Sequence, residues 1–143
     1  MKLKHIGIIV LISISLPQPF VESIASSKEI HWQAFSTGLA RGKFEKKKVF
    51  LHFYAVWCAA CDVMEKQTFK DSAVIASLND NFIPIKVDVD REKETSALFN
   101  VQLLPDTWFL TENGEIIGHR PGFIPAEQLK IILKLMMEED TEQ

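Results

Sequence analysis

The sequence predicts an α/β protein with a mixed β-sheet in a single domain. Two strongly apolar segments, residues 49–54 and 82–90, are separated by helical sequence, which is typical of parallel strands joined by a helix. Asn113-Gly114, between residues 107–111 and 115–119, predicts an antiparallel hairpin. The chain has 143 residues, which is enough for one domain with a proper core and too few for two ordinary domains.

The first predicted elements are a helix and a buried strand. Trp32, Phe35 and Leu39 recur at spacings of three and four, and this period predicts an amphipathic helix over residues 31–43. Residues 49–54, VFLHFY, are β-branched and aromatic with a single polar residue. Such a run is typical of a central strand that is buried on both faces.

The middle of the chain predicts two helices, a strand and a further helix. Residues 58–67 are rich in good helix formers. Asp71-Ser72 predicts an N-cap for a short helix over residues 73–78. Residues 82–90 then alternate apolar and polar side chains, which predicts the second strand, and residues 92–99 predict a helix.

The C-terminal part predicts a hairpin followed by a helix. Residues 107–111, TWFLT, predict the third strand after Pro105, and residues 115–119 predict the returning strand. Residues 125–137 predict a final amphipathic helix, and the acidic residues 138–143 predict a frayed tail. The expected inner face of the helix consists of Leu129, Ile132, Leu133 and Met136.

Residues 1–25 have the pattern of an export signal. A basic start precedes the apolar run 6–16, which at about eleven residues is short for a membrane span of roughly 20 residues. Small residues at Ser23 and Ala25 predict cleavage after Ala25. We therefore expect a signal peptide over residues 1–25 and a periplasmic domain over residues 26–137. An uncleaved membrane anchor is the alternative.

The composition excludes one class of function. Acidic residues number 19 and basic residues 16, and no basic patch indicates nucleic-acid binding. No heptad pattern indicates assembly, so we expect a monomer. An exported domain would work in an oxidising compartment, where disulfides form and persist.

The two cysteines, Cys58 and Cys61, have three conceivable roles. A structural zinc site needs four ligands, but His52 and His119 are scattered and show no ligand spacing. A structural bridge would close a loop too short to restrict the unfolded chain much. A redox couple fits best, because Cys58 falls where a buried strand turns into a helix, whose N-terminal N–H groups and dipole favour a thiolate. Cys61, one turn further along, is the expected resolving thiol.

The active-site region also resembles a known family. Trp57-Cys58-Ala59-Ala60-Cys61 after a buried strand resembles the active site of thioredoxin-fold proteins, and Leu104-Pro105 resembles the cis-proline that faces their cysteines. Pro121-Gly122-Phe123 is similar to the glycine turn before their final helix. Within the family, residues 53–74, FYAVWCAACDVMEKQTFKDSAV, resemble the C-terminal periplasmic domain of the transmembrane reductase DsbD. The resemblance covers most of the chain after the expected cleavage site, roughly residues 32–135, and implies a thioredoxin fold.

The resemblance implies a role for each residue of this motif set. Cys58 would be the attacking thiol and Cys61 the resolving thiol. Pro105 lacks an N–H, so an extended substrate could pair with the backbone next to Leu104. Trp57 would form one apolar wall of the substrate groove.

The chain departs from the family at several positions. His52 stands where thioredoxins have a buried aspartate, and Val56 stands where an acidic residue is frequent. A neutral His52 imidazole beneath Cys61 is the candidate proton acceptor, with a hydrogen-bonded core histidine as the alternative. Lys86 matches a lysine that lies near the family's buried acid, so its partner here is open. Three interpretations of Asp106, directly after the proline, stay open: it lies near the thiols, it discriminates among partners, or it faces water.

Together these features predict an exported thiol-disulfide oxidoreductase that reduces protein disulfides through Cys58 and Cys61. The chemistry needs no bound cofactor, and by resemblance its electron donor would be a membrane-embedded reductase of the DsbD type. Two alternatives stay open. One is a disulfide oxidase or isomerase of exported proteins, and the other is a thioredoxin-fold binding or chaperone module whose cysteines are incidental. The sequence does not fix the direction of electron flow.

Overall fold

A four-stranded mixed sheet forms the centre of the computed structural model, which describes residues 27–138. The strand order is β2-β1-β3-β4. β1 (Val49–Tyr54) pairs in parallel with β2 (Ile83–Asp88) and antiparallel with β3 (Asp106–Leu110). β4 (Ile116–Pro121) pairs antiparallel with β3 at the open edge. The predicted mixed sheet, with a parallel part followed by a hairpin, is confirmed.

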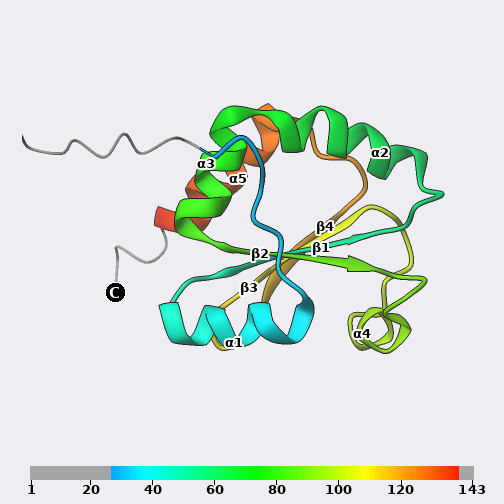
Figure 1. The fold of residues 1–143 in the computed structure, drawn as a ribbon, viewed down its shortest axis with the longest axis horizontal. Helices are drawn as coiled ribbons and strands as arrows, with labels where there is room; N and C mark the ends of the chain where they lie inside the picture. The colour runs from blue at the N-terminus through cyan, green and yellow to red at the C-terminus, as the bar shows by residue number, and fades with distance from the viewer. Residues whose placement is uncertain (1–26, 139–143) are drawn as a thin grey trace, which may run out of the picture.

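Helices cover both faces of this sheet (Figure 1). One face carries α1 (Phe35–Glu45) and α4 (Lys93–Leu98). The other carries α2 (Ala59–Lys66), the 3-10 turn η1 (Thr68–Lys70), α3 (Ser72–Asn81) and α5 (Ala126–Glu138). Within residues 27–138, none of the helices combines the length and the apolar character that a membrane crossing requires.

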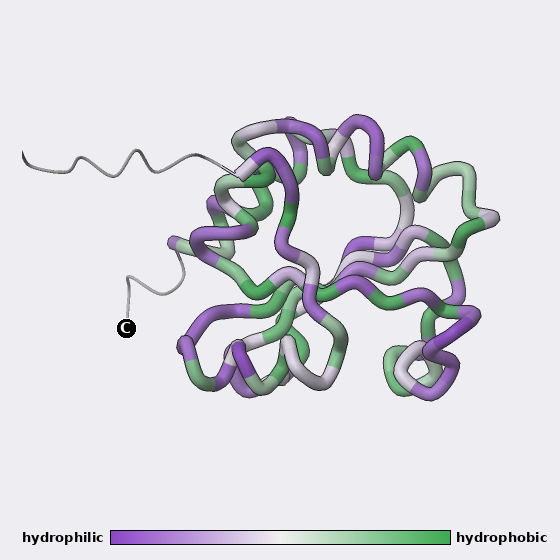
Figure 2. Tube along the Cα trace, viewed as in Figure 1, coloured by the Kyte–Doolittle hydropathy of each residue, from purple (hydrophilic) through white to green (hydrophobic). Residues whose placement is uncertain are grey.

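The sheet separates two apolar cores. Phe50, Phe69 and Leu133 belong to the core on the side of α3 and α5, whereas Leu51 and Trp108 belong to the core on the side of α1. Successive strand residues point to opposite faces, so β1 supplies both cores and is buried along nearly its whole length. Hydrophilic and hydrophobic segments alternate along the covering helices, as expected for helices with one buried face (Figure 2).

The first helix begins later than the sequence predicts. Helix α1 starts at Phe35, while Gln33 forms an isolated parallel bridge with Ile85 of β2. Trp32 packs against the core on the side of α3 and α5, and Phe35 packs against the opposite core. The chain therefore crosses the edge of the sheet between these two aromatics. The prediction of one helix over residues 31–43 was wrong in its first turn.

The remaining elements agree with the expected order. The Asp71 carboxylate caps α3 by accepting hydrogen bonds from the N–H groups of Ala73 and Val74 at 2.9 and 3.0 Å. In α5, Leu129 and Leu133 are buried, with Ile132 and Met136 partly buried against the same core. Glu138 belongs to α5 rather than to a frayed tail. The predicted signal peptide and residues 139–143 lie outside the described residues.

Candidate active site

Both cysteines lie where β1 gives way to α2. Cys58 is the N-cap residue of α2, and its Sγ accepts a hydrogen bond from the Cys61 N–H at 3.1 Å. The two residues form a disulfide with a Cα–Cα distance of 5.2 Å, and both are buried. When the bond is reduced, the unpaired N–H groups and the dipole of the helix N-terminus would stabilise a thiolate at Cys58.

A cis-proline corner faces the disulfide. The Leu104–Pro105 peptide bond is cis, as the family resemblance implies. The Leu104 side chain packs against the cluster of Ala55, Cys58 and Cys61. Its backbone N–H and C=O form no hydrogen bond with any residue in the range 27–138. An extended segment lying over Cys58 therefore meets a free donor and a free acceptor at this point.

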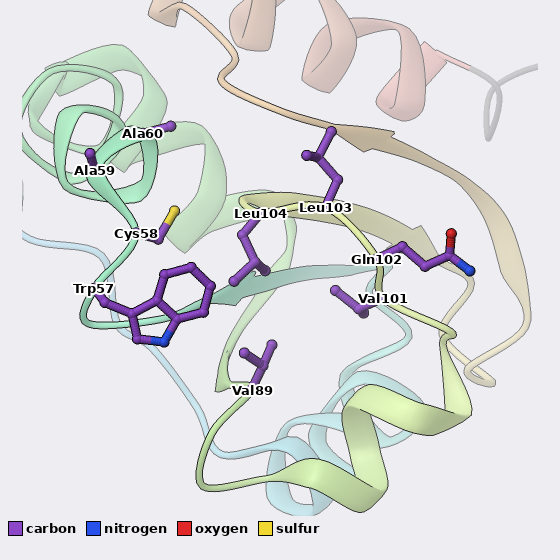
Figure 3. Close-up of a pocket in the computed structure, with 9 residues that line it drawn as sticks. All are labelled: Trp57, Cys58, Ala59, Ala60, Val89, Val101, Gln102, Leu103 and Leu104. Carbon is purple, nitrogen blue, oxygen red and sulfur yellow. The ribbon is translucent and has the colours of Figure 1, made fainter.

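The space between Cys58 and the cis-proline corner is a groove of about 520 Å³, here called the apolar groove. Trp57, Cys58 and Leu104 line it together with Ala59, Ala60, Val89, Val101, Gln102 and Leu103. Trp57 is 72% exposed, so it is not a core residue. Its Nε1 donates a hydrogen bond to Asp90 Oδ2 at 2.8 Å. The indole thus forms a wall of the groove, near Val89 and Leu104 (Figure 3).

A second cavity of about 220 Å³, here called the polar cavity, lies between α2, β1 and β2. Its lining includes His52, Tyr54, Cys61, Glu65 and Lys86. Lys86 Nζ forms an ion pair with Glu65 and lies 4.5 Å from the centre of the Tyr54 ring. The partner of Lys86, which the sequence left open, is therefore Glu65. Sequence reasoning missed Glu65, although residues four apart on one helix, such as Cys61 and Glu65, share a face.

His52 lies at the inner end of the polar cavity and is 1% exposed. Its Nδ1 is 3.1 Å from the Thr107 hydroxyl, and its ring lies edge-on to Phe69 at 4.9 Å. Burial, followed by the positive charge of Lys86, lowers the pKa of His52 from 6.5 to about 3. The imidazole is therefore neutral at physiological pH. A base with so low a pKa accepts a thiol proton poorly. The role of His52 as proton acceptor stays a prediction, and the Glu65 carboxylate is a second candidate for this role.

Asp106 does not face water. Only 3% of its surface is exposed, and its Oδ1 lies 3.1 Å from Nδ1 of His119 on β4. Among residues 27–138, no group of three or more His, Cys, Asp or Glu residues is arranged to hold a metal ion.

Comparisons with known proteins place the chain in a family. The family model of a thioredoxin-like domain matches residues 37–136, so the chain belongs to this family. Together with the Cys58–Cys61 disulfide, this membership defines a thioredoxin-like thiol-disulfide oxidoreductase.

Individual relatives agree with this assignment. The thioredoxin of Mycoplasmoides gallisepticum is 34% identical over 88 residues, which is 62% of this chain and 83% of that protein. The thiol:disulfide interchange protein DsbD of Haemophilus ducreyi is 40% identical over 91 residues, which is 59% of this chain. The match spans 16% of the length of that DsbD. The structure of a thioredoxin from Thermus thermophilus superposes with a TM-score of 0.69 at 21% identity, covering 76% of this chain and 88% of that one. The expected fold and the resemblance to DsbD are confirmed.

Proposed function

We propose that this protein reduces disulfides of exported proteins in the periplasm, acting as a monomer without a bound cofactor. The observation that carries the proposal is the position of Cys58. It caps the N-terminus of α2, where a thiolate is stabilised, and it lines the apolar groove, where a protein segment can lie.

The reaction runs through two exchanges of sulfur partners. In the reduced enzyme, the Cys58 thiolate attacks one sulfur of the substrate disulfide. An S–S bond forms to that sulfur, and the other substrate sulfur leaves as a thiolate. The Cys61 thiol then loses its proton and attacks the Cys58 sulfur, which releases the second substrate thiolate and forms the Cys58–Cys61 disulfide. Two electrons have then passed to the substrate. The Cys58–Cys61 disulfide in the structure corresponds to this oxidised state of the enzyme.

The two cavities support different parts of this cycle. The apolar groove would hold an extended substrate segment, with the free backbone groups of Leu104 as hydrogen-bond partners and Trp57 as a wall. The polar cavity would take the proton from Cys61, through the Glu65 carboxylate paired with Lys86 or through His52.

Regeneration of the dithiol requires an electron donor, because each turnover leaves the cysteines oxidised. We assign this role to a membrane-embedded reductase of the DsbD type. The similarity to DsbD supports this choice and the periplasmic location. The predicted signal peptide over residues 1–25 supports export.

Trapping of the mixed disulfide tests the proposal. A Cys61→Ala variant retains the attacking thiol and lacks the resolving one, so it should accumulate disulfide-linked complexes with periplasmic proteins. These complexes should disappear on treatment with a reductant. Cys58→Ala is the matched control and should form none. Absence of complexes with Cys61→Ala would contradict the reductase proposal and would favour a binding or chaperone module.

A further inference from the structure

Asp106 is a buried carboxylate that the reaction above does not use. It is the first residue of β3 and directly follows the cis-proline. Its Oδ1 lies 3.1 Å from Nδ1 of His119, and within residues 27–138 no other side chain forms a hydrogen bond with this carboxylate. A buried charge is costly even when it is paired. Asp106 lies two residues from Leu104, which lines the apolar groove, so the carboxylate is close to the place where a substrate would dock.

His119, the partner of Asp106, also contacts a core residue. The His119 imidazole stacks on the Trp108 indole, with ring centres 4.1 Å apart and an angle of 22° between the planes. Trp108 in turn packs edge-on against Phe99 in the core beneath the sheet. The core therefore fixes the orientation of the His119 ring, and the ring fixes the position of the Asp106 side chain.

The backbone of this corner has fewer hydrogen bonds than a regular hairpin. Asp106 lies opposite Pro121, so the continued register places Pro105 opposite Gly122. Gly122 N–H donates to the Pro105 carbonyl at 2.7 Å. A hydrogen-bonded antiparallel pair normally exchanges two such bonds, but Pro105 has no N–H with which to return the second. The contact between Asp106 and His119 supplies a side-chain link between β3 and β4 next to the missing bond.

We propose that the Asp106–His119 pair positions the cis-proline corner so that the backbone of Leu104 is presented to an extended protein substrate. This inference rests on the proposed function, because it assigns the pair to the docking of that substrate. The pair acts through the backbone of Pro105 and not on a sulfur atom. A small disulfide does not need the backbone of Leu104, so its reduction should not depend on the pair.

The test compares two substrates of the reduced mature protein, insulin and the small aromatic disulfide dithiobis(nitrobenzoate). For His119→Ala, we expect the KM for insulin to rise about five- to tenfold. Its kcat, and its rate with the small disulfide, should stay within about twofold of wild type. His119→Gln keeps an N–H donor for the Asp106 carboxylate and should recover most of the loss. His31→Gln, at an exposed histidine outside the groove, is the matched control and should behave as wild type.

Several results would overturn the inference. One is an unchanged KM for insulin in folded His119→Ala and Asp106→Asn proteins. Another is an equal loss with both substrates, which would indicate a general structural role. Thermal unfolding identifies any variant that does not fold, and if His119→Ala does not, the comparison rests on Asp106→Asn and His119→Gln. Wild-type protein that reduces the small disulfide but not insulin would overturn the proposed function and, with it, this inference.

Discussion

The apolar groove and the polar cavity meet at the same disulfide but offer opposite environments. The groove has a volume of about 520 Å³, and the described residues that line it are mainly apolar. The cavity has a volume of about 220 Å³ and contains the Glu65–Lys86 ion pair and a buried histidine. In the proposed mechanism, docking and proton transfer are therefore separated in space. Variants of the groove should therefore change KM for protein substrates, and variants of the cavity should change the rate of the thiol chemistry.

The largest effect is expected for Glu65→Gln in the polar cavity. Loss of the carboxylate removes the proposed proton acceptor for Cys61, so resolution of the mixed disulfide should slow about a hundredfold at neutral pH. The loss should be the same for protein and small disulfides, because resolution takes place after the first substrate thiolate has left. Rapid acid quenching followed by separation of the mixed disulfide measures this step. Glu127→Gln, at an exposed carboxylate on α5, is the control. A wild-type resolution rate in Glu65→Gln would exclude Glu65 as the proton acceptor and leave His52 as the candidate.

A pH dependence of stability is expected from His52. Its pKa is about 3 in the folded protein and about 6.5 in the unfolded chain. Below pH 6.5 the unfolded state therefore binds a proton that the folded state does not, and the free energy of unfolding falls as the pH decreases toward 3. The stability contributed by the neutral His52 is fully present above pH 6.5. Its loss between pH 6.5 and 5 should be about 2 kcal/mol.

Urea unfolding of the oxidised protein at several pH values measures this contribution. The carboxylates also titrate in this range, so the comparison is with His52→Leu, which retains them and lacks the imidazole. The slope of stability against pH between 6.5 and 5 should be smaller in His52→Leu. Equal slopes would mean that His52 takes up its proton at the same pH in the folded and unfolded states, which would contradict the lowered pKa of a buried, neutral imidazole.

A smaller effect is expected for Trp57→Ala in the apolar groove. Removal of the exposed indole should raise KM for a protein disulfide about tenfold, because the variant loses apolar contact area in the groove. Asp90→Ala leaves the indole in place but removes its hydrogen-bond acceptor, so its effect should be about two- to threefold. Steady-state kinetics with insulin and with a small disulfide distinguish an effect on substrate docking from an effect on the chemical step. An equal decrease with both substrates would place Trp57 in the chemistry and weaken the separation of docking from proton transfer.

Local sequence patterns were sufficient to predict the sheet and most helices. VFLHFY over β1 is apolar enough to require burial on both faces, and Gly114 adopts the positive φ of 85° that the Asn-Gly turn calls for. The failure at Trp32 has a physical reason. A helical period of three and four also arises when an extended chain changes faces at the edge of a sheet, and only tertiary packing distinguishes the two cases.

The candidate site was predictable to the extent that it is local or resembles the family. Cys58, Trp57 and Leu104 come together around one groove, as expected from the motif and the proline. Glu65 was missed because the acid was sought on β1, where the family has it, and not one helical turn beyond Cys61. The contact between Asp106 and His119 joins two strands whose register shifts between Phe109 and Leu110. A sequence does not reveal such a shift, so this pair could not be predicted.

The reduction potential of the Cys58–Cys61 couple tests the central claim most directly, because it decides the direction of electron flow. The purified domain, residues 26–137, would be equilibrated with thiol buffers of defined potential, and the fraction of reduced protein would be measured by alkylation. A reductant of protein disulfides should have a potential near that of thioredoxin, about −270 mV. A value near that of DsbA, about −120 mV, would contradict the account and identify the protein as a disulfide oxidase.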